Sequence, residues 1–228
     1  FDAAGNYHEI SRDAWGVEWE YLIYGIQGHP KSYPLSSWEE AERYRFPDHA
    51  VVRPDRQRQE EYLIFGGIGS LFERVASLQR FDTVMMDFFT RDPALLAFVD
   101  RLVEYYLPIN RRYLDAGTDV FCFGDDFGTQ SNAIFPPELF AEIFVPRYRK
   151  LFEPPQRAGK KILFHSCGKI DSLLPLLLEL HVDILWPQLS LYGRDENFLD
   201  RCAESKTALL LHPDRQYLIP RGTPAEIR

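Results

Sequence analysis

One apolar segment, Ile162-Leu163-Phe164-His165-Ser166-Cys167-Gly168, ends on an imidazole, a thiol and a glycine. Its uninterrupted apolar body is typical of a strand covered on both faces, as in a parallel sheet. Side chains of a strand alternate between its two faces, so His165 and Cys167 are predicted to project to the same side. Zinc accepts imidazole nitrogen and thiolate sulfur together, and the pair therefore indicates a metal site. A hydrogen-bonded core histidine beside an inert thiol is the alternative.

Further apolar segments of this kind alternate with helical patterns along the chain. The predicted strands are Tyr62–Phe65, Asp119–Phe123, Lys161–Phe164, Val182–Trp186 and Thr207–Leu211. The predicted helices are Ser70–Leu78, Asp92–Ala116, Pro137–Gln156, Ile170–Leu180 and Asp195–Ala203. Alternating apolar strands and helices indicate an α/β fold whose parallel sheet is covered on both faces.

The repeated spacing of strands and helices predicts a (β/α)8 TIM barrel. An open doubly wound sheet is the alternative, and the absence of a dinucleotide phosphate fingerprint disfavours it. The chain begins at Phe1 rather than Met and stops at Arg228, just after a helical pattern starts near Pro224. We therefore expect the barrel to be incomplete in this chain, with N-terminal and C-terminal parts missing.

The first part of the chain has a different character. Residues 1–60 are irregular and rich in aromatics, and we expect this segment to pack on a single barrel domain formed by residues 61–228. Alternation over Trp15–Tyr21 predicts a strand that Leu22-Ile23-Tyr24 extends. A short helix is predicted over Ser37–Arg45.

Composition disfavours several classes of partner. Of the 228 residues, 45% are hydrophobic and 26% are charged, as in ordinary globular proteins. A formal net charge of -8 argues against nucleic acid or an acidic membrane held by bulk electrostatics. Three cysteines are too few for a disulfide scaffold, no apolar run is long enough for a membrane span, and the first residues of this sequence carry no signal-peptide pattern. We expect a cytoplasmic protein without nucleic-acid or membrane partners.

Polar or glycine-rich residues follow every predicted strand. They are Gly66-Gly67-Ile68-Gly69, Gly124 to Gln130, His165-Ser166-Cys167-Gly168, Pro187-Gln188 and His212-Pro213-Asp214. In a (β/α) barrel the carboxyl ends of the strands share one mouth, which holds the active site. The strand ends therefore predict one functional site. The glycine-rich segment after Phe65 would bring amides near an anion or, as the favoured interpretation, form a tight turn.

Asp125 and Asp126 are the second candidate cluster. Adjacent carboxylates repel each other, so holding both near a pocket raises one pKa or requires a cationic partner. The alternative is a loop whose carboxylates cap the next helix. For Asp126, a functional role and a capping role are equally favoured. For Asp125, the capping role is favoured over a functional one.

Several motifs together carry a family resemblance. They are Asp13–Val17, Pro34-Leu35, Phe81–Asp87, Gly124–Gln130, Phe140–Tyr148, His165–Gly168, Val182–Gln188 and Gly222-Thr223-Pro224. In this order they make the chain resemble the uroporphyrinogen decarboxylase superfamily, and most closely its branch of cobalamin-dependent methyltransferases and decarboxylase-like proteins. The resemblance implies a TIM-type barrel.

The resemblance also implies roles for residues. In the methyltransferase branch an H-x-C pair and a later cysteine hold Zn²⁺, which implies that His165 and Cys167 are metal ligands and that the third cysteine lies beyond Arg228. Asp126 and Gln130 would be catalytic residues that line the cavity and orient the substrate. We expect Asp125, Gln188 and His212 to bind substrate.

Three functions remain open at this point. The first is a zinc-dependent methyltransferase that moves a methyl group between a corrinoid, carried by a partner protein, and a thiol or pterin acceptor. The second is metal-free decarboxylation of an acidic tetrapyrrole; the arginine pair that the resemblance implies for it would precede Phe1. The third is a non-catalytic barrel that binds a corrinoid or a partner protein. A homodimer is the candidate assembly.

Overall fold

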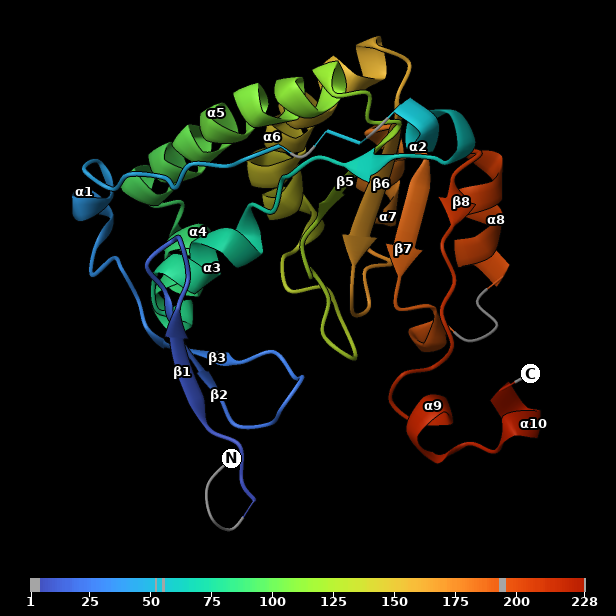
Figure 1. The fold of residues 1–228 in the computed structure, drawn as a ribbon, viewed down its shortest axis with the longest axis horizontal. Coiled ribbons are helices and arrows are strands. Elements are labelled where there is room, and N and C mark those ends of the chain that lie inside the picture. Colours follow the sequence, from blue (N-terminus) through green and yellow to red (C-terminus); the bar gives the residue numbers. More distant parts are fainter. Residues whose placement is uncertain (1–4, 52, 55, 193–195, 228) are drawn as a thin grey trace. The chain divides into compact units, whose positions relative to one another are not determined.

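The computed structural model describes residues 5–51, 53–54, 56–192 and 196–227 (Figure 1). The chain divides into two compact units, and each unit is built from two separate segments. Unit 1 comprises Phe1–Ala50 and Leu71–Tyr105, and unit 2 comprises Val51–Ser70 and Tyr106–Arg228. The predicted domain boundary between residues 60 and 61 stays a prediction.

Unit 1 contains an antiparallel sheet with the order β1-β2-β3. Its strands are β1 (Glu9–Arg12), β2 (Glu18–Tyr21) and β3 (His29–Ser32). Its helices are α1 (Trp38–Ala41), α3 (Phe72–Leu78), α4 (Phe81–Thr90) and the first part of α5 (Pro93–Asp115). The indole of Trp38 is buried and donates a hydrogen bond of 2.7 Å to Asp87 of α4, which ties α1 to the core of this unit.

The strand predicted over Trp15–Tyr21 forms only in its second half. The carboxylate of Asp13 accepts hydrogen bonds from the amides of Trp15 and Val17, at 2.9 and 3.0 Å, and closes a turn before β2. Gly16 has a φ of +82° in that turn, a value that favours glycine. The predicted extension through Leu22-Ile23-Tyr24 is wrong, because these residues lie in the exposed connection to β3.

Unit 2 contains a parallel sheet, and the part of the chain that the structure describes contributes five strands to it in the order β4-β5-β6-β7-β8. The strands are β4 (Phe65–Gly66), β5 (Val120–Gly124), β6 (Lys161–Ser166), β7 (Ile184–Pro187) and β8 (Ala208–Leu209). Each neighbouring pair is parallel. The predicted α/β class is confirmed.

Helices precede, separate and follow these strands along the chain. They are α2 (Arg56–Glu61), the second part of α5, α6 (Pro137–Arg157), α7 (Leu174–Glu179), α8 (Glu196–Glu204), α9 (Leu218–Arg221) and α10 (Pro224–Ile227), with a short 3-10 helix at Leu189–Leu191. The predicted start of α8 at Asp195 lies outside the described residues. None of the described helices is long and apolar enough to cross a membrane.

The packing of α6 fixes which face of β6 carries the candidate ligands. Phe164 of β6 packs against Tyr148 of α6, with ring centroids 5.0 Å apart, and against Phe152 at 6.2 Å. Alternation along the strand turns Leu163 and His165 to the opposite face. The imidazole is therefore directed away from the aromatic layer under α6.

Candidate metal centre

Three side chains meet where β5 and β6 end. Nε2 of His165 lies 3.3 Å from Sγ of Cys167 and 3.3 Å from Oδ1 of Asp126. One ligand atom from each residue lies within 4.8 Å of those of the other two, and all three side chains are partly exposed. His165 and Cys167 project together, as strand alternation predicts. Asp126 comes from the neighbouring strand end, because β5 and β6 run parallel and finish at the same edge of the sheet.

Backbone hydrogen bonds join the two loops that carry these residues. The amide of Gly128 donates to the carbonyl of Cys167 at 3.1 Å, and the amide of Lys169 donates to the carbonyl of Thr129 at 2.7 Å. The amide of Cys167 also donates to Oδ1 of Asp126 at 2.8 Å. The loops after β5 and β6 therefore hold the carboxylate, the imidazole and the thiol in one arrangement.

A hydrogen bond at Nδ1, the other ring nitrogen, orients the imidazole of His165. Nδ1 lies 2.9 Å from the carbonyl oxygen of Trp186 in β7. A carbonyl oxygen only accepts, so Nδ1 carries a hydrogen and donates it. Histidines that bind metals commonly use one nitrogen for such a bond and the other as the ligand. The indole of Trp186 also covers the imidazole, with ring centroids 4.7 Å apart.

The charges of the cluster shift two pKa values. Burial lowers the pKa of His165, but hydrogen bonds to Asp126 and Cys167 and electrostatic interactions with both residues overcome this and raise it to about 10. Burial raises the pKa of Asp126, but the hydrogen bonds from His165 and from the amide of Cys167 outweigh it and lower the pKa overall. In the metal-free protein a protonated imidazole thus contacts both the carboxylate of Asp126 and Sγ of Cys167.

The donor set fits zinc. Tetrahedral zinc with bonds of about 2.0–2.3 Å places its ligand atoms roughly 3.5 Å apart, close to the two 3.3 Å separations from Nε2. Imidazole nitrogen, thiolate sulfur and carboxylate oxygen are the ligands that zinc uses in proteins. Catalytic sites have three protein ligands and one open position. The family resemblance implies a cysteine beyond Arg228 as the third ligand, whereas the described residues already offer Asp126.

Arg215 also reaches the cluster, and the sequence reasoning missed it. Nη2 of its guanidinium lies 3.1 Å from Sγ of Cys167. The residue lies in the segment after β8, three positions beyond His212, and no motif singles it out. Only the fold brings a residue 48 positions away along the chain to the thiol.

The other predicted site residues are placed differently. Asp125 is fully buried and accepts hydrogen bonds from the hydroxyls of Ser70, at 2.6 Å, and Tyr148. Gln188 is buried and accepts a hydrogen bond of 3.2 Å from the amide of Gly168, which supports the turn after Cys167. Gln130 is exposed in the loop after β5. Their predicted roles in catalysis and substrate binding stay predictions.

His212 lies near the cluster without joining it. Its Nδ1 is 2.9 Å from the carbonyl oxygen of Pro213, and its ring centroid is 6.4 Å from that of Trp186. Nε2 of His212 and Nε1 of Trp186 are buried and have no hydrogen-bond partner in the described part of the chain. His165, Trp186 and His212 thus form a row of rings along the ends of neighbouring strands.

In the segment Gly66-Gly67-Ile68-Gly69, Gly66 ends β4 and the other three residues lie outside helices and strands. Asn110 of α5 holds both the amide and the carbonyl of Ile68, at 2.8 Å each. Gly67 has a φ of +93°. One amide that an anion would need is therefore already used by Asn110, and the favoured interpretation as a tight turn stays a prediction.

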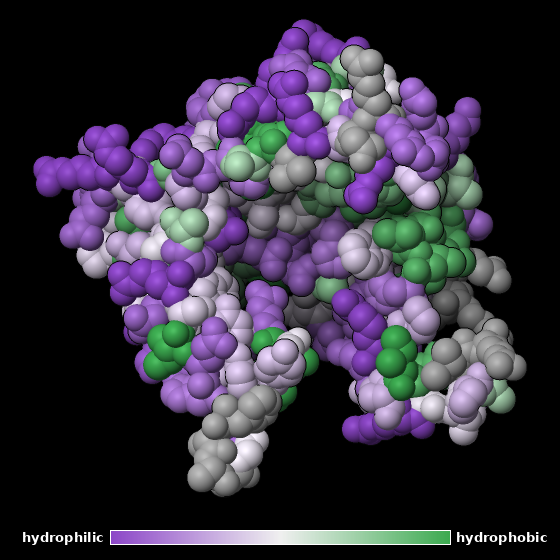
Figure 2. Space-filling view, viewed as in Figure 1, coloured by the Kyte–Doolittle hydropathy of each residue, from purple (hydrophilic) through white to green (hydrophobic). Residues whose placement is uncertain are grey.

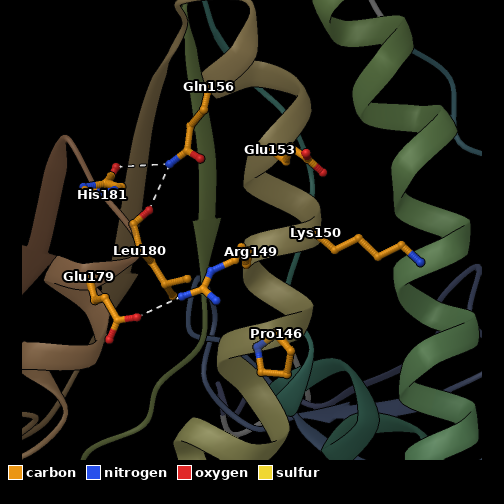
Figure 3. Close-up of a pocket in the computed structure, with 8 residues that line it drawn as sticks. All are labelled: Pro146, Arg149, Lys150, Glu153, Gln156, Glu179, Leu180 and His181. Atoms are coloured by element: carbon orange, nitrogen blue, oxygen red, sulfur yellow. Dashed lines mark hydrogen bonds and ion pairs between the residues drawn. The ribbon is translucent and has the colours of Figure 1, made fainter.

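A groove of about 640 Å³ lies elsewhere in unit 2 (Figure 3). It is lined by α6 and by the turn between α7 and β7, so it lies near the amino ends of the strands. Arg149 is paired with Glu179 at 3.0 Å, and Gln156 donates to the carbonyls of Leu180 and His181 at 2.9 and 3.3 Å. In Figure 3 Lys150 points away from Arg149. The side chains drawn do not converge on a ligand position, unlike those of the metal centre.

Comparisons with known proteins agree with the fold and with the motifs. The family described as uroporphyrinogen decarboxylase (URO-D) matches residues 37–188 of the chain. Among solved structures, a methyltransferase from Methanosarcina mazei is similar, with a TM-score of 0.60 and 15% sequence identity. The similarity covers 86% of this chain but only 59% of the methyltransferase. At this identity it bears on the fold alone. The comparison with curated sequences gave no match.

Proposed function

Because this chain belongs to the uroporphyrinogen decarboxylase family, we propose that it is a zinc-dependent methyltransferase of that family. The proposed reaction moves a methyl group between a corrinoid, carried by a partner protein, and a thiol or pterin acceptor. One observation carries the proposal: Asp126, His165 and Cys167 offer three zinc-type ligand atoms within 4.8 Å of one another. The similarity to a methyltransferase structure supports it at the level of the fold.

The residues of the chain have distinct parts in this proposal. Asp126, His165 and Cys167 hold the metal, and the carbonyl of Trp186 keeps Nδ1 of His165 protonated so that Nε2 is the ligand. Bound zinc would lower the pKa of an acceptor thiol and so supply a thiolate at neutral pH. Gln188 supports the turn that positions Cys167. Gln130 would orient the substrate at the mouth.

The contacts of the imidazole favour a shared cation over a nucleophilic triad. In a cysteine–histidine–carboxylate triad the thiol and the carboxylate bind opposite nitrogens of the ring. Here Cys167 and Asp126 both approach Nε2, and a backbone carbonyl occupies Nδ1. Two acidic groups around one nitrogen form a pocket for positive charge, which is what a metal ion requires.

We also propose that the sheet belongs to a closed (β/α)8 barrel. Within the described residues it ends at β4 and β8, and both ends expose apolar side chains. Phe65 of β4 is 54% exposed, and Leu211 just after β8 is 63% exposed. The space-filling view shows hydrophobic surface around β8 (Figure 2). Strands added at these edges would cover that surface and pair the open backbone groups.

Decarboxylation of an acidic tetrapyrrole is the second candidate, and the family description favours it. Asp126 would then bind pyrrole N–H groups. This reaction gives no task to Cys167, whose thiol lies in the same cluster. Anaerobic incubation of the protein with uroporphyrinogen checks the candidate, which requires coproporphyrinogen as the product.

Metal analysis tests the first proposal. We expect the purified protein to contain about one zinc per chain. His165→Ala, Cys167→Ala and Asp126→Ala should each weaken zinc binding at least about 100-fold, because each removes a direct ligand, whereas loss of an outer-shell partner costs about 10–100-fold. Cys202→Ala is the matched control, because Cys202 is buried in α8 outside the cluster.

The variants separate the alternatives. Unchanged zinc content in Cys167→Ala would refute the metal centre, as would a wild-type protein that binds no zinc. Loss of zinc in Cys202→Ala as well would point to unfolding rather than to ligand loss, so circular dichroism of each variant accompanies the metal analysis.

A further inference from the structure

Two adjacent carboxylates at the end of β5 face opposite sides of the sheet. Phe123 packs against Phe152 of α6, with ring centroids 4.7 Å apart, so it lies on the face that this helix covers. Alternation places Asp125 on the same face as Phe123 and turns Asp126 to the other face, beside His165. One carboxylate therefore lies under α6, and the other lies at the candidate metal centre.

Both oxygens of the Asp125 carboxylate accept hydrogen bonds from hydroxyl groups. Oδ1 accepts one of 2.6 Å from Ser70, which lies between β4 and α3, and Oδ2 accepts one from Tyr148 of α6. Asp125 and Tyr148 are both fully buried. The amide of Asp125 donates to the carbonyl of His165 at 3.1 Å. Asp125 thus joins the segment after β4, helix α6 and the end of β6.

These contacts affect Asp126 through the backbone. A hydrogen bond from a hydroxyl to a carboxylate is stronger than one between neutral groups, and a buried acceptor that loses its donor is strongly destabilised. The two hydroxyls therefore fix Asp125, and the peptide unit between the two aspartates sets the direction in which Asp126 projects. Oδ1 of Asp126 lies 3.3 Å from Nε2 of His165. A small rotation of that peptide unit would carry this oxygen away from an ion bound to Nε2.

We propose that Asp125 is a positioning residue of the metal centre, whose contacts with Ser70 and Tyr148 set the direction of the ligand Asp126. This inference rests on the proposed function, since it assumes a metal ion at Asp126. It gives Asp125 a role other than the expected substrate binding. It also makes Ser70 and Tyr148 determinants of metal affinity, although neither belongs to the cluster of ligand atoms.

Removal of one hydroxyl at a time tests these contacts. Tyr148→Phe and Ser70→Ala should each weaken zinc binding about tenfold, as expected for residues that position a ligand. Asp125→Ala should weaken it about 100-fold, and Asp125→Asn only about tenfold, because the amide oxygen still accepts from one hydroxyl. Tyr44→Phe is the matched control, since the hydroxyl of Tyr44 also donates, to the carbonyl of Trp15, but lies in unit 1.

A double-mutant cycle shows whether these contacts act through Asp126. Tyr148→Phe is combined with Asp126→Ala, and zinc affinity is measured by competition with a chromophoric chelator. In the Asp126→Ala background, Tyr148→Phe should change the zinc affinity less than about twofold, because the ligand that it positions is gone. General loosening of the fold would weaken binding equally in both backgrounds. Circular dichroism and urea unfolding of each variant identify any that does not fold, and the two hydroxyl variants still test the inference if Asp125→Ala is one of them.

The outcomes separate the inference from the proposed function. A wild-type protein that binds no zinc refutes the proposed function, and the inference falls with it. Unchanged zinc affinity in Tyr148→Phe and Ser70→Ala, with zinc bound by the wild type, refutes the inference alone. An equal loss from Tyr148→Phe with and without Asp126 also refutes it, because Tyr148 would then support the site without acting through Asp126. A similar loss in Tyr44→Phe would refute it as well.

Discussion

In the proposed metal centre, a proton and a metal ion would compete for one nitrogen of His165. In the metal-free protein the pKa of His165 is raised to about 10, because the hydrogen bonds and charges of Asp126 and Cys167 outweigh the effect of burial. Nε2 is therefore protonated at neutral pH. A protonated nitrogen has no lone pair for a metal, so binding must release this proton.

The competition predicts a pH dependence of zinc affinity. Below the pKa of His165, each fall of one pH unit should weaken zinc binding at least about tenfold, because one proton or more is displaced. The affinity should thus rise between pH 6 and pH 8. Competition titrations with a chromophoric chelator over this range measure the slope. An affinity that does not change with pH would show that Nε2 carries no proton in the metal-free protein.

Asp125 and Asp126 show what residue types alone cannot predict. The sequence placed both near a pocket, and the cationic partner expected for adjacent carboxylates exists for Asp126 in His165. Asp125 is fully buried, and the hydroxyls of Ser70 and Tyr148 are among its hydrogen-bond donors. The two hydroxyl partners come from distant parts of the chain, so no local pattern distinguishes the two aspartates. The pair His165 and Cys167 was predictable because a two-residue period is local.

At the scale of elements, the loops after β5 and β6 are in close contact. Gly168 has a φ of +78°, and a Cβ there would lie 2.0 Å from the carbonyl oxygen of Gly128. A Cβ on Gly128 would lie 2.5 Å from the carbonyl carbon of Gly168. Only glycine at both positions allows the loops after β5 and β6 to approach closely enough to share hydrogen bonds.

A comparison of two glycines tests this contact. Gly159 has a φ of +70° with nothing near its Cβ position, so Gly159→Ala should cost only backbone strain, about 1 kcal/mol of the free energy of unfolding. Gly168→Ala adds the steric clash and should cost about 3 kcal/mol. It should also weaken zinc binding about tenfold or more, as Cys167 moves relative to Asp126. Urea unfolding and zinc titration of both variants measure these effects; equal costs would contradict the close contact.

The elements were predictable where one face is clearly apolar. The strands and helices of unit 2 follow the alternation of apolar segments and helical patterns, although β8 is shorter than predicted. The strand predicted over Tyr62–Phe65 is largely wrong, because β4 begins only at Phe65 and Tyr62 is 66% exposed. Helix α4 was not predicted. Its exposed side carries the apolar residues Phe81, Met86 and Phe89, so the sequence does not show a clear helical period of apolar residues there.

At the scale of the whole molecule, the candidate centre belongs to one unit. Asp126, His165, Cys167 and Arg215 all lie in unit 2. Unit 1 has its own core, which includes the buried side chains of Trp38, Phe88 and Phe98. The sequence could not predict these units, because each is assembled from separate segments and α5 contributes to both.

Removal of zinc should therefore affect the two units unequally. If zinc binds only the folded centre, as the proposed function requires, it should stabilise unit 2 by about 2.7 kcal/mol when its free concentration is 100 times the dissociation constant. We expect a chelator to accelerate amide hydrogen exchange in residues 124–130 and 165–169, whose loops the ligands join, and to leave α3 and α4 of unit 1 unchanged. Hydrogen exchange with mass spectrometry, with and without the chelator, measures this, and Cys167→Ala should show no response to it. Equal acceleration in α3 and α4 would contradict a metal effect confined to unit 2, and a response that persists in Cys167→Ala would place the zinc elsewhere.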